Sequence, residues 1–437
     1  MKRVLHSIDR VEVTFDDPNL VANAGLLLVG TLVVRLELER LVNAMVRLSG
    51  RVGGALPGRK VLTLVHAMVV GGSHIDHADV LRSGNTTGML PHRVMAPSTL
   101  GTFLRAFTFG HVRQLEAVVG EVLRRAWALG AGPGAARLVI DVDSTICEVV
   151  GKLKAGAAYG YTKVLGYHPI LASRADTGEV LHARLRKGSA NTARGARRFI
   201  EELIARVRRA GAAGEIVVRL DSGFWSNETI KALGRLDVRY TMAVRTNTKG
   251  VAPAIAAIPD DEWRDIDYSA DGQAQVAECI YKSKRLIVRR TRLSDPHQLK
   301  LWPDWRHFAF LTDLEGDTVS VDAFHREHAV VELDIRDLKE GAGLEHLPSG
   351  NFSANSAWLQ CTVLAHNLLR WTVTVGRHAP VEQRTVASTV RHRLIAIPGR
   401  LVSHAGKPTL RGPLNWPWRE WFARRLAVLR ALQPAPG

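Results

Sequence analysis

RLVIDVDST (residues 137–145) and EIVVRLDSGFW (residues 215–225) contain two short runs of β-branched residues that each lead into an aspartate. Their length and composition predict buried strands. Between them, YHPILAS (167–173) and GEVLHARL (178–185) predict two more strands around an Asp-Thr-Gly turn, and residues 191–210 predict an arginine-rich helix. The pattern up to this point is three strands, a helix and a fourth strand.

The elements that follow complete a recognisable order. A short helix is predicted over residues 227–233 and a fifth strand over residues 238–245. The order βββαβαβ is that of the ribonuclease H-like fold, in which the first and fourth strands are parallel neighbours. Asp143 and Asp221, which are 221 − 143 = 78 residues apart, are then expected to meet at the carboxyl ends of these strands. The predicted fold class is α/β.

A third acidic residue is predicted on a long helix from about Val321 to Lys339. Val331, Ile335 and Leu338 form an apolar stripe along this helix. Glu332 borders that stripe, so its carboxylate is expected near the edge of the sheet. Residues three, four or seven positions apart share one face of a helix. The face of Glu332 carries four basic side chains that are candidates to contact DNA phosphates: His325, His328, Arg336 and Lys339.

Three carboxylates suit the chemistry of phosphodiesters. Attack by a hydroxyl and departure of the leaving oxygen both create negative charge, which two divalent ions about 4 Å apart can stabilise. Because Mg²⁺ prefers carboxylate oxygens, Asp143, Asp221 and Glu332 are predicted to hold it, with Mn²⁺ as a substitute. Asp141 shares a strand face with Asp143 and remains an alternative first ligand. Taken singly, each acid has a more ordinary interpretation as a turn cap or a solvated charge.

In their order along the chain, these motifs resemble the DDE transposases of bacterial insertion sequences, specifically the group numbered thirteen-eighty. The resemblance covers nearly all of the chain. It rests on DVDST, GAAYGY, GYHPILA, LDSGFW, ELDIRDLKEG and LPSGNFSANSAWLQCTVLAHNLLRW, which lie between residues 141 and 371. It implies cut-and-paste transposition by strand cleavage and strand transfer at terminal inverted repeats, on a ribonuclease H-like core with a β-rich insertion. By this resemblance, Asp143, Asp221 and Glu332 are the catalytic triad.

One difference from the family concerns the helix of Glu332. Related transposases often carry Tyr, Arg, Glu and Lys at relative positions −7, −4, 0 and +7. This chain instead has His325 and His328 at the first two positions, and Lys339 at the last. Histidine is a weaker, pH-dependent phosphate ligand than arginine. The two histidines leave open a catalytically decayed DNA-binding derivative. A ribonuclease H-like nuclease that cleaves without joining strands is a second alternative, because the same carboxylates would serve it.

Changes in pattern divide the chain into five segments. AGPGA (131–135) separates an amphipathic helical region, where Leu26–Arg47 predicts one helix and Ser98 or Thr99 a helix cap, from the first strand. The expected segments are a helical DNA-binding or dimerisation region (1–130), the first part of the core (131–245), a β-rich insertion (246–318), the second part of the core with the glutamate helix (319–375) and a basic C-terminal segment (376–437).

Charge and composition point to a nucleic-acid partner. The chain has 59 Lys and Arg residues against 42 Asp and Glu, and the resulting net charge of +17 predicts a polyanionic partner. The expected partner is double-stranded DNA, as terminal repeats and as target, bound by a homodimer or larger synaptic complex. The three cysteines lie far apart and make no zinc or disulfide pattern, and no apolar run is long enough for a membrane span. A cytoplasmic, nucleoid-associated protein is expected.

Two further groups of residues are candidates for DNA contacts. Arg194, Arg197 and Arg198 could follow backbone phosphates, although a solvated charged face is equally consistent with the sequence. Three tryptophans of the insertion could stack on an extruded base if cleavage passes through a DNA hairpin, although core packing is their more ordinary role. These tryptophans are Trp263, Trp302 and Trp305.

Overall fold

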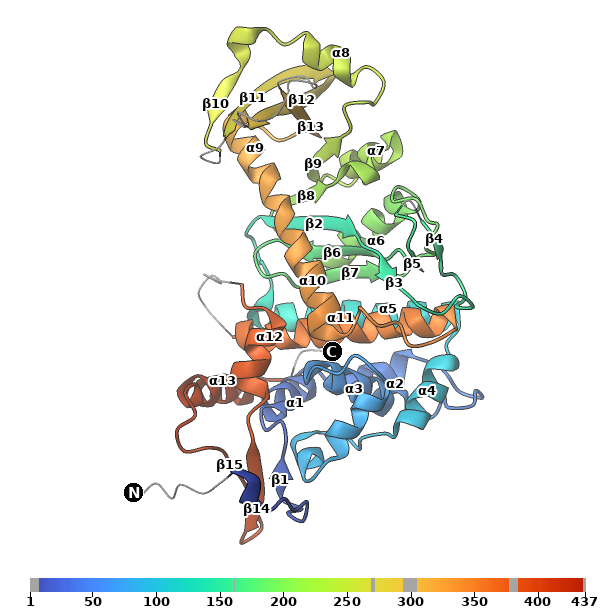
Figure 1. Cartoon of the computed structure of the whole chain (residues 1–437), viewed down its shortest axis with the longest axis vertical. Helices are drawn as coiled ribbons and strands as arrows, with labels where there is room; N and C mark the ends of the chain where they lie inside the picture. Colours follow the sequence, from blue (N-terminus) through green and yellow to red (C-terminus); the bar gives the residue numbers. More distant parts are fainter. Residues whose placement is uncertain (1–7, 161, 269–271, 294–304, 377–383, 435–437) are drawn as a thin grey trace.

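The computed structural model describes residues 8–160, 162–268, 272–293, 305–376 and 384–434. The chain forms a mixed α/β fold in which one large sheet stands above a mostly helical base (Figure 1). No helix within these ranges is both long enough and apolar enough to cross a membrane.

The large sheet has the strand order β10-β11-β12-β13-β9-β8-β2-β6-β7. Strand β2 is parallel to β8, and β8 is parallel to β9, whereas the other neighbours are antiparallel. The prediction that the first and fourth strands of the core are parallel neighbours is therefore confirmed. The strands are β2 (Leu138–Ser144), β6 (Ile170–Arg174), β7 (Val180–Arg184), β8 (Ile216–Leu220), β9 (Arg239–Val244), β10 (Arg264–Ile266), β11 (Gly272–Tyr281), β12 (Lys284–Leu293) and β13 (Arg306–Thr312).

Two elements of the core begin later than predicted. The strand expected from Tyr167 begins at Ile170, and Tyr167 instead ends β5 of a small separate sheet, order β3-β5-β4. Helix α6 begins at Ala196, because Gly195 before it has a left-handed φ of 78°. The small-sheet strands are β3 (Cys147–Glu148), β4 (Ala158–Tyr159) and β5 (Leu165–Tyr167), and the helices beside the core are α6 (Ala196–Ala210), η5 (Ser222–Phe224) and α7 (Asn227–Arg235).

The strands predicted in the insertion form, and they lengthen the large sheet. Strand β13 pairs antiparallel with β9, so that Ala309 lies opposite Val244. The hairpin of β11 and β12 continues the sheet outward, with β10 at its edge (Figure 1). The insertion also contains α8 (Val251–Ala256) and the 3-10 turn η6 (Asp260–Glu262).

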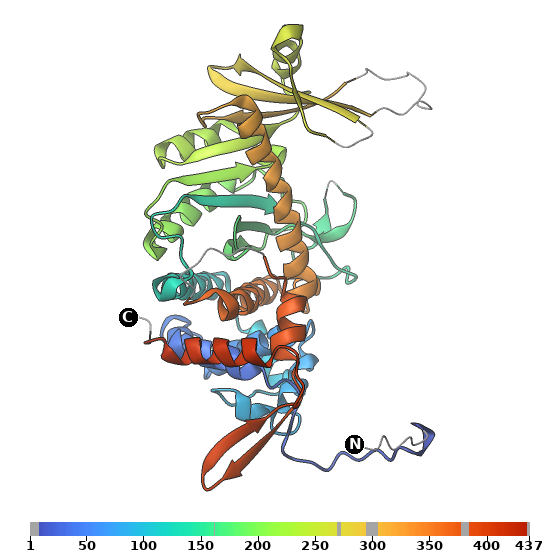
Figure 2. The same ribbon diagram turned by 90° about the vertical axis from the view of Figure 1, so that its left-hand side faces the viewer.

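The long helix predicted over residues 321–339 has an irregular turn in its middle. It consists of α9 (Thr318–Arg326), the 3-10 turn η7 (Glu327–Val330) and α10 (Val331–Ala342). Arg219 Nη1 donates to the carbonyl oxygen of Phe324 at this point (2.7 Å), and a side chain that enters the helical ladder is a recognised cause of such irregularity. These elements run along the sheet from the insertion to the helical base (Figure 2).

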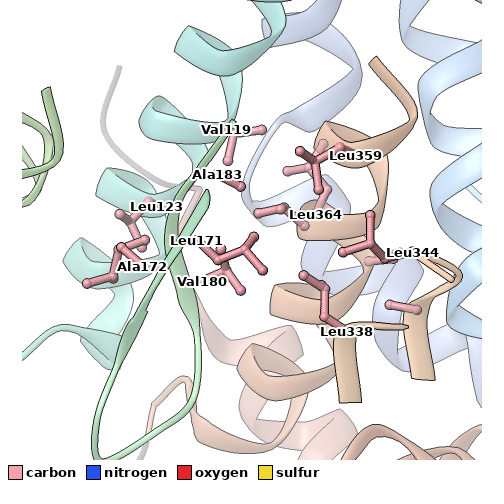
Figure 3. Packing of buried hydrophobic residues seen from close by; sticks show 14 of the residues in the cluster. Val119, Leu123, Leu171, Ala172, Val180, Ala183, Leu338, Leu344, Leu359 and Leu364 are labelled. Carbon is pink, nitrogen blue, oxygen red and sulfur yellow. The ribbon is translucent and has the colours of Figure 1, made fainter. Parts of the chain in front are cut away.

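Helix α11 (Phe352–Thr374) is buried along most of its length at the base of the sheet. Its apolar residues meet β6, β7 and α5 (Phe109–Ala126), as Figure 3 shows for Leu359 and Leu364. Polar residues on α11 bind the free edge of β7. Asn367 both accepts from Val180 N and donates to Val180 O, each at 2.8 Å. The sheet edge is therefore covered at Val180, where both backbone groups are satisfied.

The two ends of the chain meet in the helical base. Strand β1 near the N-terminus pairs with β14 near the C-terminus, and β14 pairs with β15. The helix predicted over Leu26–Arg47 is two helices, because Glu37 takes a left-handed φ of 51° between them. Neither Ser98 nor Thr99 caps a helix, since Pro97 begins α4 and Ala96 is its N-cap. The elements are η1 (Ile8–Arg10), β1 (Leu20–Val21), α1 (Leu26–Arg35), α2 (Leu38–Met45), α3 (Pro57–Val69), η2 (Asp76–Arg82), η3 (Thr86–Met89), α4 (Pro97–Arg105), η4 (Trp127–Ala131), α12 (Ala387–Val390), η8 (Arg391–Ile395), β14 (Gly399–His404), β15 (Lys407–Arg411) and α13 (Arg419–Ala431).

Candidate functional site

Asp143 and Asp221 come together through the register of two strands. The parallel pair β2 and β8 ends with Val142 opposite Leu220, so the next residues of the two strands are Asp143 and Asp221. Asp221 Oδ1 accepts from Gly223 N at 2.9 Å and caps the 3-10 turn that follows β8. Asp143 Oδ1 accepts from Ser144 N at 2.6 Å. Both carboxylates lie at the carboxyl end of the two central strands.

Glu332 reaches the same edge of the sheet from helix α10. It is exposed, whereas Val331 and Leu338 of the predicted stripe are buried against the core. Glu332 and Asp143 line one pocket of about 400 Å³. Burial, together with the negative charges of Asp221 and Glu332, raises the pKa of Asp143 to about 6. Asp143 is therefore close enough to Asp221 and to Glu332 to be repelled by the charge of each.

Asp141, the alternative first ligand, is engaged in a buried ion pair. Arg219 donates from Nε to Oδ1 (2.7 Å) and from Nη2 to Oδ2 (2.8 Å). His328 Nδ1 lies 2.7 Å from Asp141 Oδ1. Burial opposes ionisation of Asp141, but the hydrogen bonds from His328 and Arg219 outweigh it and lower the pKa of the carboxyl. Both oxygens of Asp141 are thus occupied, which favours Asp143 as the ligand.

The basic residues of the glutamate helix lie in different surroundings. Arg336 is exposed and lines the pocket of Glu332, as does Lys339, whose Nζ donates to Ile146 O at 2.8 Å. His325 instead stacks on Phe310, with ring centroids 4.1 Å apart. Burial lowers the pKa of His325 to about 3, so the cation needed to attract a phosphate is absent near neutral pH.

These contacts favour packing roles for both histidines. His325 Nδ1 lies 2.7 Å from Thr241 Oγ1, and the Asp141 contact occupies Nδ1 of His328. The phosphate-binding roles of His325, His328, Arg336 and Lys339 stay predictions. Within this set, the geometry favours Arg336 and Lys339.

The candidate DNA-contact residues on α6 are divided by their surroundings. Arg194 and Arg198 line a basic pocket beside the carboxyl end of β7, whereas Arg197 is exposed outside it. Arg198 Nε also pairs with Glu202 Oε1 at 2.9 Å. The structure therefore separates three arginines that the sequence placed together.

Two tryptophans of the insertion, Trp263 and Trp305, lie against Arg290. The guanidinium of Arg290 lies 4.1 Å from the ring centroid of Trp263 and 4.6 Å from that of Trp305. Trp263 is buried, and Trp305 is half-buried. Both line a pocket of about 450 Å³. Trp302 lies outside the described residues.

Across residues 4–434 the chain matches the family described as transposase DDE domain, group 1. The chain belongs to this family of DDE transposases. A cryo-electron microscopy structure of a piggyBac transposase synaptic complex with hairpin DNA is also similar, at 14% sequence identity and a TM-score of 0.43. That match covers 86% of this chain and 79% of the other. No curated protein matches the sequence.

DDE transposases cleave and transfer DNA strands and generally use divalent metal ions. The predicted acids fit such ions chemically. Asp143, Asp221 and Glu332 offer hard oxygen ligands, and a cation among them would offset the burial and the carboxylate repulsion that raise the pKa of Asp143. In this transposase the carboxylate pocket also has open space beside Glu332.

A second cluster with metal-ligating side chains has different surroundings. Ligand atoms of Glu116, His182 and Glu202 lie within 4.8 Å of one another. However, Arg184 pairs with both carboxylates, and Arg113 lies 2.9 Å from Glu202. These guanidiniums already neutralise the acids, so the cluster suits an ion-pair network joining α5, β7 and α6.

Sequence reasoning missed the acids on the inner face of the glutamate helix. Asp334 and Asp337 are buried, and each pairs with Arg370 of α11. Asp337 also accepts from the backbone N–H of Ala387 (2.9 Å). Asp334 lies three residues after Val331 and four before Leu338, a spacing that places it on the buried face, and Asp337 follows Asp334 by three residues.

Proposed function

We propose that this chain is the transposase of an insertion sequence of group thirteen-eighty. It would cut the element at its terminal inverted repeats and join it to target DNA, using two divalent ions held by Asp143, Asp221 and Glu332. The observation that carries this proposal is the pairing of β2 with β8, which sets Asp143 beside Asp221 at the edge that Glu332 overlooks.

Each acid has a distinct part in the proposed site. The charges of Asp221 and Glu332 both raise the pKa of Asp143. Asp143 would therefore be the acid that contacts both ions. Asp221 and Glu332 would each hold one. Bound Mg²⁺ or Mn²⁺ supplies positive charge to the attacking and leaving oxygens. Arg336 and Lys339 beside Glu332 would attract the phosphate and orient it toward the acids.

The proposed core is ribonuclease H-like. Its support is the local strand order β7-β6-β2-β8-β9, which places the third, second, first, fourth and fifth strands of the predicted βββαβαβ unit side by side. We propose residues 131–245 and 319–375 as the two parts of this core, with residues 246–318 inserted between them. Residues 1–130 are proposed to recognise the terminal repeats and to form the dimer or larger synaptic complex, and residues 376–437 are the basic C-terminal segment.

Excision of a marker flanked by the element's own ends tests the proposal. Asp143→Asn, Asp221→Asn and Glu332→Gln should each abolish excision while the protein stays folded and binds DNA. Glu340→Gln is the matched control, because Glu340 lies eight residues further along the same helix and is exposed in the same pocket. Undiminished excision by any of the three variants removes that acid from the site.

The same assay separates a transposase from a nuclease. A target plasmid is added, and joined products are counted beside cleaved ends. Joined products that vanish in the Asp143→Asn protein support strand transfer. Cleavage with no joined product at any concentration of target would favour the ribonuclease H-like nuclease.

A further inference from the structure

A second pocket opens beside the carboxyl end of strand β7, where helix α6 begins. It measures about 470 Å³. Its lining includes no acidic side chain, and half of the lining residues are cationic. The cationic residues are Arg184, Arg186, Lys187, Arg194 and Arg198.

Two of these cations are already neutralised. Arg184 pairs with Glu116 and Glu202, and Arg198 also pairs with Glu202. Arg186, Lys187 and Arg194 have no carboxylate partner among the residues that the structure describes. The pocket therefore concentrates three uncompensated positive charges, which favour an anionic ligand.

Of these three side chains, Arg186 gives the strongest indication of an anion site. Its Nε donates to His168 O and its Nη1 to Thr192 O, both at 2.9 Å, so the guanidinium is held in one orientation. Its Nη2 is buried without an acceptor in the described part of the chain. Burial also lowers the pKa of Arg186 to about 10. A buried guanidinium with an unused N–H is costly unless an anion completes it.

The pocket lies on the same edge of the sheet as the carboxylates. Strand β7 is antiparallel to β6, which is antiparallel to β2, so β7 and β2 point the same way and end at the same edge. Two strand spacings amount to about 10 Å. A DNA strand that passes the carboxylates would therefore reach this pocket within a few nucleotides. Thr192 of the pocket loop also packs against Gly223, two residues after Asp221, since a Cβ on Gly223 would lie 2.9 Å from the Thr192 side chain.

We propose that this pocket binds one backbone phosphate of a DNA strand, within a few nucleotides of the phosphate that is cut. Arg186, Lys187 and Arg194 surround the phosphate oxygens, and the N-terminus of α6 at Gly195 adds to the positive field. The position of the cut rests on the proposed function. The phosphate site itself rests on the pocket.

The first experiment measures DNA affinity without catalysis. A fluorescein-labelled 20-base-pair duplex of random sequence is titrated in EDTA, so that the divalent metal site plays no part. The double variant Lys187→Gln/Arg194→Gln removes two charges from the pocket. The matched control Arg209→Gln/Lys231→Gln removes two exposed charges of α6 and α7 outside it. Arg186 is left intact because it also holds the loop carbonyls.

The pocket variant is expected to bind about tenfold more weakly than the wild type, and its salt dependence should fall by about one phosphate contact. The control variant should stay within about twofold of the wild type. Thermal unfolding confirms that both variants are folded. Equal losses in the two variants would overturn the pocket assignment.

A second experiment locates the bound phosphate. In a duplex that carries the cleavage site, single phosphates on each side are replaced by neutral methylphosphonate. Wild-type protein should lose affinity at one position within a few nucleotides of the cut, and the Lys187→Gln/Arg194→Gln protein should be insensitive there. Identical profiles for the two proteins contradict the inference.

The excision and DNA-binding assays together distinguish failure of the proposed function from failure of the phosphate pocket. The first case is that the proposed function is wrong. In that case Asp143→Asn leaves excision unchanged, yet the pocket variant still weakens binding of the random duplex in EDTA. If instead excision depends on Asp143 and the pocket variant binds like the control, the phosphate pocket is wrong and the transposase proposal stands.

Discussion

His328 Nδ1 lies 2.7 Å from Asp141 Oδ1, and this contact joins the helix of Glu332 to strand β2 two residues before Asp143. Arg219 strengthens the same connection, because it donates to both oxygens of Asp141 and to Phe324 O on helix α9. None of these three side chains lines the pocket of Glu332. We therefore infer that Asp141, Arg219 and His328 hold Glu332 in position relative to Asp143.

Replacing His328 should impair catalysis more than DNA binding. His328→Ala removes the Asp141 contact, so Glu332 loses its fixed position, and cleavage is expected to slow by about tenfold or more. His328→Asn places an N–H donor near the position of Nδ1 and should restore much of the rate. Cleavage rate and DNA affinity are measured on the same preparations. A parallel tenfold loss of DNA affinity would instead identify His328 as the phosphate contact predicted from the sequence.

Asp143 should destabilise the metal-free protein as it ionises. Burial, with the charges of Asp221 and Glu332, raises its pKa in the fold to about 6 from 3.8. The folded state therefore holds the proton more tightly than the unfolded chain, so this stabilisation is present below about pH 4 and is lost as pH rises through about 6.

Asp143→Asn removes this titration. Compared with the wild type, it should raise the free energy of unfolding by about 1–2 kcal/mol at pH 7 and by much less at pH 4. Urea denaturation in EDTA measures both values. Asp261→Asn, at an exposed position, is the control and should show no such pH dependence. A constant difference between pH 4 and pH 7 would contradict the raised pKa.

Much of the core could be predicted because its signals are local. The β-branched runs before Asp143 and Asp221 define strands on their own, and their parallel pairing then fixes the register. The partners of His325 and His328 could not be predicted, since Thr241 and Asp141 lie 84 and 187 residues away in sequence. Nor could the extension of the sheet, because pairing of β13 with β9 depends on how the chain returns after the insertion.

Several errors arose where tertiary contacts outweigh local preference. Residues 191–195 belong to an arginine-rich segment that favours a helix, yet Arg186 binds the carbonyls of Thr192 and Arg194 and holds the chain in a loop. The buried polar residues of helix α11 are likewise explained only by their partners. Asn367 looks unsuited to a buried helix until its two bonds to Val180 are known. Polar residues in buried positions become intelligible only with their partners.

Divalent cations should stabilise the wild-type protein through the three acids. Binding at ten to one hundred times the dissociation constant adds about 1.4–2.7 kcal/mol, so Mg²⁺ or Mn²⁺ should raise the melting temperature relative to EDTA. Asp143→Asn, Asp221→Asn and Glu332→Gln should each lose most of this increase. Glu116→Gln should keep it, because Glu116 belongs to the ion-pair network with Arg184. If Glu116→Gln alone lost the increase in melting temperature, the cation site would instead be assigned to the cluster of Glu116, His182 and Glu202.

The tryptophans of the insertion are expected to act through packing. Arg290 lies over both Trp263 and Trp305, and Arg292 also lies over Trp305 at 4.7 Å, so an extruded base would have to displace a guanidinium. Trp263→Ala should therefore cost about 3 kcal/mol of stability. Trp305→Ala should cost less, because that side chain is only half-buried.

The ratio of hairpin to nicked product separates packing from base stacking. If the tryptophans act through packing, both variants should keep the wild-type ratio at a temperature where they are fully folded, even where total cleavage falls. If Trp305 stacks on a base, Trp305→Ala should lower hairpin yield while nicking and stability stay near wild type. That second outcome would place the extruded base at the pocket that Trp305 and Trp263 share, since both line it with Arg290.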